Sequence, residues 1–408
     1  MQLLCADFVM PLDDACGIIQ KGAVVFEETI IEVGRSEDLK LKYPDATIIE
    51  TPPNSVLLPG LINVHTHLEY SANTTSLVYG DFMQWLYSVI RHRERISAMA
   101  TTELIASKLK EMLHSGTTTL GAISSFGADL EACVQSPQRV VYFNEVLGSV
   151  AYVVDTMYTD FLNRFEMSKE HASLRFFPAV AVHSPYSTHP VLAKKALLLA
   201  QEEGCVVSTH FMESQAERQW IDTQEGDFKA FLSTYNPDVK PLYTPLEYLE
   251  MFQNANALFT HGVQANHEEL TLLSSQHATL THCPVSNRLL GVGKLDLSAI
   301  QRHGINLTLG TDGLSSNISL NLWDEMRAAV LMHTDENLVE LAKVLLHSVT
   351  INAAKALHLP CGSLKKGLYA DIIVVQLPES CQSDMIPLQL ILHTHQTVMS
   401  FINGVRYV

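Results

Sequence analysis

The sequence is poor in basic residues. Its 408 residues include 27 lysines and arginines against 44 aspartates and glutamates, which gives a formal net charge of −17. A protein that neutralises nucleic-acid phosphates needs a basic face, and no run of lysine or arginine occurs here. We therefore expect no nucleic acid among the partners of this protein.

Paired cysteines and long apolar segments are also missing. The seven cysteines are widely spaced and form no CxxC motif, which is typical of reduced thiols rather than of a disulfide framework. The first residues do not combine a basic stretch with an apolar one, and no uncharged apolar run of about 18 residues occurs. These absences predict a cytoplasmic protein without a signal peptide and without a membrane partner.

The chain does contain ample apolar material and an unusual number of histidines. Hydrophobic residues make up 47% of the sequence, and 18 residues are histidines. One α/β barrel needs only roughly 250 residues, so the chain can hold a barrel and an additional part. Because imidazole binds metals and carries protons near neutral pH, the positions of the histidines bear directly on function.

Both ends of the chain have the pattern of short β-strands. The first 56 residues contain alternating apolar segments separated by turns, and residues 370–375 and 397–408 have the same character. Asn403 and Gly404 within the last segment predict a β-hairpin. The similar composition of the two ends predicts one small β-sandwich, formed by residues 1–56 together with 361–408.

Residues 57–360 alternate short apolar strands with longer amphipathic segments. This repetition predicts an α/β fold with a parallel sheet, and eight candidate strands favour a closed TIM-type (β/α)8 barrel. The predicted strands are 56–64, 118–123, 140–145, 175–182, 205–209, 257–260, 278–281 and 306–310. The clearest predicted helices are 102–114, 190–203 and 322–332.

Polar residues stand at the same end of most predicted strands. The first strand runs into His65 and His67, and residues i and i+2 of an extended segment project to the same side, so both imidazoles can reach one ion. Later strands end in single polar residues, namely His183, His210, His261, His282 and Asp312. The carboxyl ends of barrel strands face one mouth, where we expect these side chains to gather.

Any one of these residues alone would more often be structural than a metal ligand. Together they supply three imidazoles and a carboxylate with one position left open, which is the composition of a catalytic mononuclear site. A second, bridged metal would require an acid or a carboxylated lysine at the end of the fourth strand, where this chain has His183. We predict one divalent metal ion, with zinc as the first expectation and ferrous iron as the alternative, because both accept imidazole and carboxylate.

Two motifs connect the chain with a known family. The stretch Pro59-Gly-Leu-Ile-Asn-Val-His-Thr-His67 resembles the opening motif of the amidohydrolase superfamily, and residues 362–375 are similar to its G-x-x-x-x-G-x-x-A-D segment. The resemblance covers almost the whole chain. It implies that the metal is held by His65, His67, His210 and Asp312, and that His261 lies next to these ligands, as in the mononuclear deaminase branch.

Glu213 follows His210 by three residues, a spacing similar to that of purine, pyrimidine and triazine deaminases. The simpler interpretation is a solvated acid at a helix N-terminus. The resemblance instead implies that Glu213, His261 and Asp312 are catalytic. A metal ion would lower the pKa of bound water toward about 7. Asp312 would accept a proton, Glu213 would protonate a ring nitrogen, and His261 would orient the nucleophile.

The substrate implied by the resemblance is an adenosine derivative. Residues 67–71, 283–290 and 311–320 are most similar to the bacterial aminodeoxyfutalosine deaminases, which implies conversion of 6-amino-6-deoxyfutalosine to futalosine and ammonia in menaquinone biosynthesis. This purine nucleoside carries a 5′ substituent that ends in a carboxyphenyl group. Alternatives are deamination of 5′-methylthioadenosine or S-adenosylhomocysteine, another hydrolysis such as that of a triazine, and a non-catalytic barrel. Relatives that act on methylthioadenosine commonly have an acid before the first-loop tryptophan, where this chain has Gln84.

Several residues are candidates for contact with this substrate. Arg288 is the predicted partner of the carboxylate, whereas for Arg91, Arg93 and Arg95 an exposed ion pair is the simpler interpretation. Glu69 could contact a hydroxyl or support a ligand histidine. The remaining candidates are His183, Ser316 and Asn317. The sequence leaves the oligomeric state open, with a homodimer among the alternatives.

Overall fold

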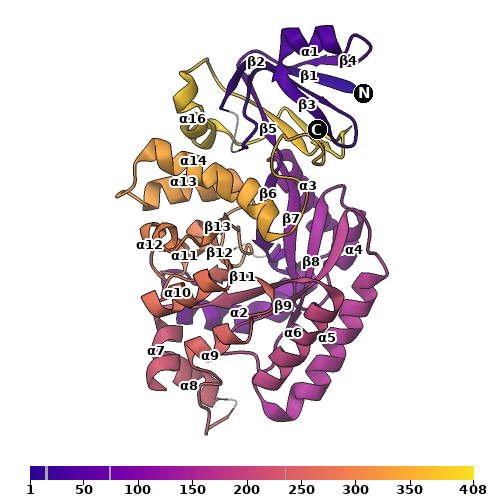
Figure 1. Ribbon diagram of the computed structural model, residues 1–408. Coiled ribbons are helices and arrows are strands. Elements are labelled where there is room, and N and C mark those ends of the chain that lie inside the picture. Colours follow the sequence, from indigo (N-terminus) through magenta and orange to yellow (C-terminus); the bar gives the residue numbers. More distant parts are fainter. Residues whose placement is uncertain (14–16, 73–74, 235) are drawn as a thin grey trace.

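The computed structural model describes residues 1–13, 17–72, 75–234 and 236–408. The two chain ends together form an eight-stranded sheet, here called the terminal sheet, at one end of the molecule (Figure 1). Its order is β16-β15-β14-β5-β1-β2-β3, with β4 also paired to β1. Its strands are β1 (Gln2–Val9), β2 (Ile19–Phe26), β3 (Ile30–Arg35), β4 (Thr47–Glu50), β5 (Ser55–Pro59), β14 (Ile372–Gln376), β15 (Met399–Ile402) and β16 (Val405–Arg406).

Pairing across the terminal sheet joins segments that are far apart in the sequence. β14 runs antiparallel to β5, with Ile372 opposite Pro59. Asn403 and Gly404 have φ angles of 48° and 73° between β15 and β16, as a two-residue hairpin turn requires. The predicted hairpin is therefore confirmed, as is the small β unit predicted from both chain ends as a sandwich, whose strands here pair into one continuous sheet.

The middle of the chain forms the predicted TIM-type barrel. Its eight parallel strands follow in chain order: β6 (Leu61–Thr66), β7 (Thr117–Ser124), β8 (Arg139–Val146), β9 (Phe176–Val182), β10 (Val206–Phe211), β11 (Asn256–His261), β12 (Thr279–His282) and β13 (Asn306–Leu309). The single strand predicted over 56–64 is wrong, because β5 belongs to the terminal sheet and β6 to the barrel. The division into residues 57–360 and the two chain ends stays a prediction.

The barrel closes between its last and first strands through polar contacts. Asn63 Nδ2 donates to Thr311 Oγ1 at 2.7 Å, and the backbone N–H of Thr311 donates to Asn63 Oδ1 at 3.3 Å. The backbone N–H of Asp312 donates to the carbonyl of His65 at 3.1 Å. These bonds fix the loop after β13 against the strand that carries the HxH motif.

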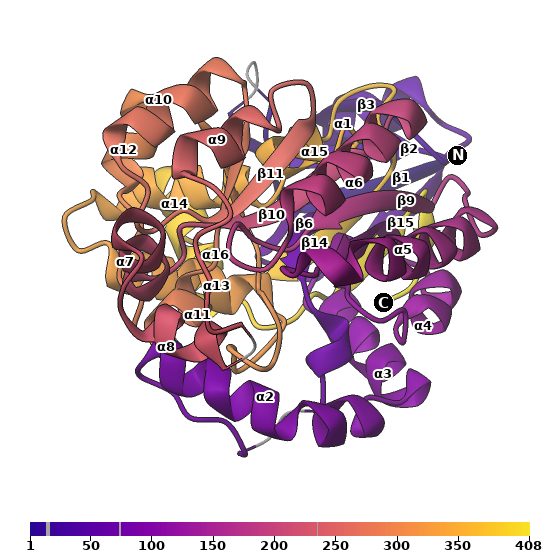
Figure 2. The same cartoon turned by 90° about the horizontal axis from the view of Figure 1, so that it is seen from below.

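Helices surround the barrel (Figure 2). The three predicted helices have the expected bounds, and Thr101 caps one of them by accepting a hydrogen bond from the Leu104 N–H at 3.3 Å. The helices are α1 (Ser36–Lys42), α2 (Phe82–Met99), α3 (Thr102–His114), α4 (Leu130–Gln135), α5 (Val154–Lys169), α6 (Pro190–Glu203), α7 (Gln215–Thr223), α8 (Asp227–Ser233), α9 (Pro245–Glu250), α10 (His267–Ser275), α11 (Pro284–Leu289), α12 (Leu297–Arg302), α13 (Leu322–Met332), α14 (Leu338–Ser348), α15 (Ile351–Ala356) and α16 (Ile386–His393). Short 3-10 turns are η1 (Leu68–Tyr70), η2 (Ala151–Val153) and η3 (Ser383–Met385).

No helix in the described ranges is long and apolar enough to cross a membrane.

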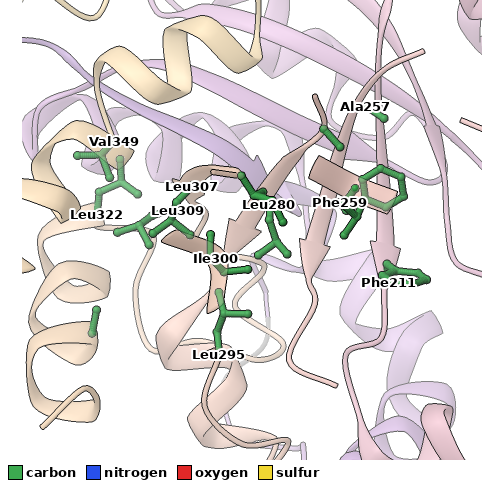
Figure 3. Packing of buried hydrophobic residues seen from close by; sticks show 14 of the residues in the cluster. Phe211, Ala257, Phe259, Leu280, Leu295, Ile300, Leu307, Leu309, Leu322 and Val349 are labelled. Carbon is green, nitrogen blue, oxygen red and sulfur yellow. The ribbon is translucent and has the colours of Figure 1, made fainter. Parts of the chain in front are cut away.

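The hydrophobic core lies between the strands and these helices. Figure 3 shows Phe211 and Phe259 on neighbouring strands, with Leu280 and Leu309 on the next two, packed toward residues of the surrounding helices. All four side chains are fully buried. Burial of these alternate residues holds the strands in register and leaves their carboxyl ends for polar residues.

The terminal sheet covers the amino ends of the first barrel strands. The backbone N–H of Thr397 donates to the carbonyl of His114, just before β7, at 2.8 Å. Arg139, the first residue of β8, forms an ion pair at 3.1 Å with Asp371, which immediately precedes β14 of the terminal sheet. The carboxyl ends of the strands therefore open away from the terminal sheet.

Candidate active site

Three imidazoles converge at the carboxyl ends of β6 and β10. His67 Nε2 lies 3.2 Å from His65 Nε2 and 3.4 Å from His210 Nε2. The three candidate ligand atoms all lie within 4.8 Å of one another. Three ring nitrogens that face one point form a donor set that fits a divalent cation.

The other ring nitrogens of these histidines have their own partners. His210 Nδ1 lies 2.8 Å from the carbonyl oxygen of His183, which can only accept, so Nδ1 carries the proton and Nε2 is free to bind an ion. His65 Nδ1 lies 3.1 Å from Thr260 Oγ1. The rings are thus oriented from behind by neighbouring strands.

Asp312 faces the same point from the loop after β13. Its Oδ1 lies 3.5 Å from His67 Nε2 and 3.9 Å from His65 Nε2. The hydroxyls of Ser286 and Ser316 donate to Oδ2 at 2.8 and 2.7 Å. Oδ2 is thus held by two hydroxyls, while Oδ1 faces the histidines and accepts a hydrogen bond from the Gly313 N–H at 2.9 Å.

Unusual backbone geometry brings these elements together. Asp312 and His261 have left-handed φ angles of 56° and 75°, a conformation that costs on the order of 1–3 kcal/mol and that turns each chain sharply at a strand end. A Cβ atom on Gly310 would lie 2.8 Å from the Cβ of His65, and one on Gly313 would lie 3.0 Å from the Cβ of His67. Glycine therefore permits the close approach of this loop to β6.

Glu213 and His261 form a second pair beside the imidazoles. Glu213 is 5% exposed, and its Oε1 lies 3.5 Å from His261 Nε2. Burial raises the pKa of Glu213, and the negative charges of Asp312 and Glu217 raise it further. His261 Nδ1 lies 3.0 Å from Asn287 Oδ1, a contact in which the ring nitrogen donates and Nε2 is directed toward Glu213.

A cavity of about 490 Å³ opens directly onto these groups. Its polar end contains His67, His210, Glu213, His261 and Asp312. The rest is largely apolar and is lined by α2, the loop after β8, η2 and α8. A pocket that combines a few polar groups with apolar walls is typical of small-molecule sites.

Comparisons with known proteins agree with this geometry. The model of the amidohydrolase family matches residues 56–405. The chain belongs to the amidohydrolase family. It is 45% identical to an aminodeoxyfutalosine deaminase of Nitratiruptor sp., over 96% of each chain, and 36% identical to an adenosine deaminase of Helicobacter pylori, over the full length of both. A crystal structure of Helicobacter pylori aminofutalosine deaminase in complex with methylthio-coformycin superposes with a TM-score of 0.96, at 35% identity and with full coverage of both chains.

The amidohydrolase fold brings seven of the predicted site residues to the cavity or its metal-binding end, namely His65, His67, His183, His210, Glu213, His261 and Asp312. His183 lies on the cavity wall, and its Nδ1 contacts the hydroxyls of Ser184 and Ser187. Its ring centroid is 5.0 Å from that of His210. The histidines predicted from strand ends therefore do meet at one mouth, except for His282, which does not line the cavity.

Four predicted substrate contacts lie elsewhere in this amidohydrolase. The Glu69 carboxylate accepts hydrogen bonds from the backbone N–H groups of residues 125, 126 and 128, so it anchors the loop after β7. Ser316 holds Asp312, and Asn317 is buried and donates to the Thr311 carbonyl at 2.6 Å. Arg288 is exposed on α11 and does not line the cavity. Their sequence neighbours reach the mouth, but these side chains point into the supporting framework or into solvent.

Glu145 is a cavity residue that was not predicted. It is the next-to-last residue of β8, is 1% exposed, and accepts a hydrogen bond from Ser125 Oγ, while its Oε1 has no hydrogen-bond partner. Ligand atoms of Glu145, His183 and His210 also lie within 4.8 Å of one another. The signal was present, because Glu145 is the last residue of the predicted strand 140–145 and obeys the same strand-end rule as the histidines.

Asn287 is the second residue that sequence reasoning missed. Besides its contact with His261, its Nδ2 lies 3.2 Å from His282 Nδ1. His282 Nε2 in turn lies 3.2 Å from His333 Nε2. Asn287 thus connects His261 to a buried pair of histidines behind the site. No local pattern marks this role, because the partners are on separate strands and helices.

Proposed function

We propose that this amidohydrolase is a hydrolytic deaminase whose substrate is 6-amino-6-deoxyfutalosine, which it converts to futalosine and ammonia in menaquinone biosynthesis. The observation that carries the proposal is the buried Glu213 carboxyl, 3.5 Å from His261 and beside the imidazole cluster. Burial raises the pKa of this carboxyl and so favours its protonated form, which can donate a proton to a ring nitrogen. The similarity to deaminases over the whole chain supports the same reaction.

The donor set identifies the residues that would hold the metal. His65, His67, His210 and Asp312 provide three neutral nitrogens and a carboxylate, a set suited to zinc and, as the alternative, to ferrous iron. When bound, the ion lowers the pKa of a water molecule and so supplies the nucleophile near neutral pH. Elemental analysis of protein purified without added metal distinguishes the two ions.

The side chains then handle the protons of the reaction. Asp312 accepts a proton from the water molecule. The oxygen of that water attacks the ring carbon that carries the amino group. Glu213 donates a proton to the adjacent ring nitrogen, and His261 orients the water and the developing charge. The proton held by Asp312 passes to the amino nitrogen, which leaves as ammonia, and Glu213 recovers its proton as the ring carbonyl forms.

Ammonia release from a panel of nucleosides tests this function. We expect the highest kcat/KM for 6-amino-6-deoxyfutalosine, compared with 5′-methylthioadenosine, S-adenosylhomocysteine, 5′-deoxyadenosine and adenosine. A clear preference for methylthioadenosine would overturn the proposed substrate but not the reaction. Hydrolysis of a chlorotriazine without any release of ammonia from the nucleosides would overturn both.

We also propose a cytoplasmic location and a homodimer. Six cysteines are free in the part of the chain that the structure describes, as expected in a reducing compartment. Cell fractionation tests the location, and sedimentation equilibrium tests the dimer.

A further inference from the structure

The substrate cavity has two unlike ends. One end holds the imidazoles, Glu213 and Asp312. The other is a slot between the apolar residues of α2, those around η2 and those of α8, which are Leu86, Val89, Ile90, Val150, Val153, Phe231 and Leu232. A purine ring at the polar end would leave this slot for whatever extends from the 5′ position of its ribose.

One face of α2 runs along the slot. Trp85, Val89 and Arg93 follow one another at intervals of four residues, so they lie on one stripe of the helix, and all three line the cavity. The indole Nε1 of Trp85 donates to the carbonyl of Ser315 at 2.8 Å, which fixes this end of the stripe beside the Asp312 loop. Arg93 lies about 12 Å further along the helix, from the rise per residue.

Arg93 is the one arginine or lysine among the described residues that line the cavity. Its side chain is exposed, and the described residues form no salt bridge with it. The nearby Tyr70 hydroxyl has a pKa raised by burial, an effect that the positive charge of Arg93 opposes. The guanidinium is therefore at the cavity without a carboxylate of its own.

We infer that Arg93 and the apolar slot form a subsite that binds a terminal carboxylate on the 5′ substituent of the substrate. The inference rests on the proposed function for the identity of that substituent. The slot suits a phenyl ring, and the guanidinium on the cavity wall suits the carboxylate, which it can bind through two parallel hydrogen bonds.

Charge explains why the cation must be at this place. The protein carries a net charge of −17, and Glu145, Glu213 and Asp312 line the polar end of the cavity. An anionic group would be repelled there, and a carboxylate left unpaired in the apolar slot would lose its hydration. Arg93 provides the local positive charge that offsets both effects and fixes which end of the substrate enters first.

A cycle of two enzymes and two substrates tests the subsite. The enzymes are the wild type and Arg93→Gln, and the substrates are 6-amino-6-deoxyfutalosine and its carboxamide analogue, which differ only in the terminal charge. We expect Arg93→Gln to lower kcat/KM for the carboxylate on the order of 10- to 100-fold, mainly through KM, with little change for the carboxamide. The wild type should prefer the carboxylate, and the variant should not.

Two matched variants control for position and charge. Arg95→Gln removes a guanidinium from the same helix outside the cavity lining, and Arg288→Gln removes the residue that the sequence favoured. Both should keep the wild-type preference for the carboxylate. Equal losses on both substrates in Arg93→Gln, or no loss on either, would overturn the subsite, as would a loss of preference in Arg288→Gln alone.

The subsite can also be separated from the proposed function. If the wild type released no ammonia from 6-amino-6-deoxyfutalosine while deaminating 5′-deoxyadenosine, the proposed substrate would fail. The carboxylate and carboxamide would then be compared as competitive inhibitors of 5′-deoxyadenosine deamination. Weaker inhibition by the carboxylate in Arg93→Gln than in the wild type would support the subsite, and equal inhibition would overturn it.

Discussion

The barrel buries ionisable side chains at both ends, but in different arrangements. At the amino ends of the strands, the Arg139 guanidinium donates to Asp371 at 3.1 Å and to Asn403 Oδ1 at 2.7 Å, and it lies 4.0 Å from the ring centre of Tyr369. At the carboxyl ends, three imidazole nitrogens face one another, and one oxygen of Glu145 has no partner.

This difference separates structural charge from functional charge. A buried ion needs an opposite charge and hydrogen bonds, and the two terminal nitrogens of Arg139 have both within the chain, while its Nε has no partner. The groups at the mouth lack some of their hydrogen-bond and charge partners within the chain. Such a shortage is tolerable at a site where a metal ion and a substrate supply the missing partners. Changes at the amino ends should therefore affect stability, whereas changes at the mouth should affect activity.

The largest expected effect is that of Glu213→Gln. The amide cannot donate a carboxyl proton, so we expect kcat to fall on the order of 10²- to 10⁴-fold. The free energy of unfolding should stay unchanged or rise, because a buried carboxyl is removed. Steady-state kinetics and urea unfolding measure the two quantities at equal metal content. Retention of most of the activity would contradict the role of Glu213 as proton donor.

Arg139→Met should have the next largest effect, at the opposite end of the barrel. It leaves Asp371 buried without its partner, and we expect a loss of about 3–5 kcal/mol in the free energy of unfolding. Activity per folded molecule should not change. The double variant Arg139→Met/Asp371→Asn should recover part of the stability. If Arg139→Met were as stable as the wild type, or folded but lost kcat, the charges at the amino ends would not be purely structural.

Asn287→Ala should reduce activity by a smaller factor. The side chain orients His261 from behind, and loss of such a partner typically costs about 10- to 100-fold in activity. Asn306→Ala removes a comparable amide at the amino end of β13, where it donates to Thr279 Oγ1, and is the control. Similar kcat values in the two variants would show that Asn287 has no special part in orienting His261.

The last prediction concerns pH and Glu325, which is buried beneath the Asp312 loop. Burial raises its pKa to about 8, against about 4.3 for an exposed glutamate. Between these values the folded chain holds a proton that the unfolded chain has lost, so stability falls as pH rises. The slope from this group is at most about 1.4 kcal/mol per pH unit.

Urea unfolding between pH 5 and pH 8 tests this slope, because Glu325→Gln should flatten it. The Asn306→Ala variant should keep it, since that substitution removes no ionisable group and lies at the amino end of β13. An unaltered slope in Glu325→Gln would assign the pH dependence to another group.

Much of the fold follows from local patterns in the sequence. Helices α3, α6 and α13 have the predicted bounds because apolar spacing and capping residues are local signals. The strands of the barrel were found within one or two residues of their ends. The exception is 56–64, where a continuous apolar run contains two strands that belong to different sheets, and periodicity does not distinguish these cases.

The candidate site was predictable where one rule applied repeatedly. The carboxyl ends of parallel strands must meet, so His65, His67, His210, His261 and Asp312 could be placed together from their positions after strands. The same rule would have identified Glu145. The rule does not apply to loop residues. The direction of a loop side chain depends on sharp turns and on contacts with distant segments.

The sequence by itself determined the βα order, the hairpin at Asn403 and the donor types at the mouth, because these depend on neighbours two to four residues away. Tertiary structure alone decided that Ser316 supports Asp312, that Asn287 stands behind His261, and that Arg93 rather than Arg288 lines the cavity. The physical reason is that a side chain in a loop or on a covering helix is aimed by packing against elements that are remote in sequence. The spacing of apolar residues along the chain does not predict that packing.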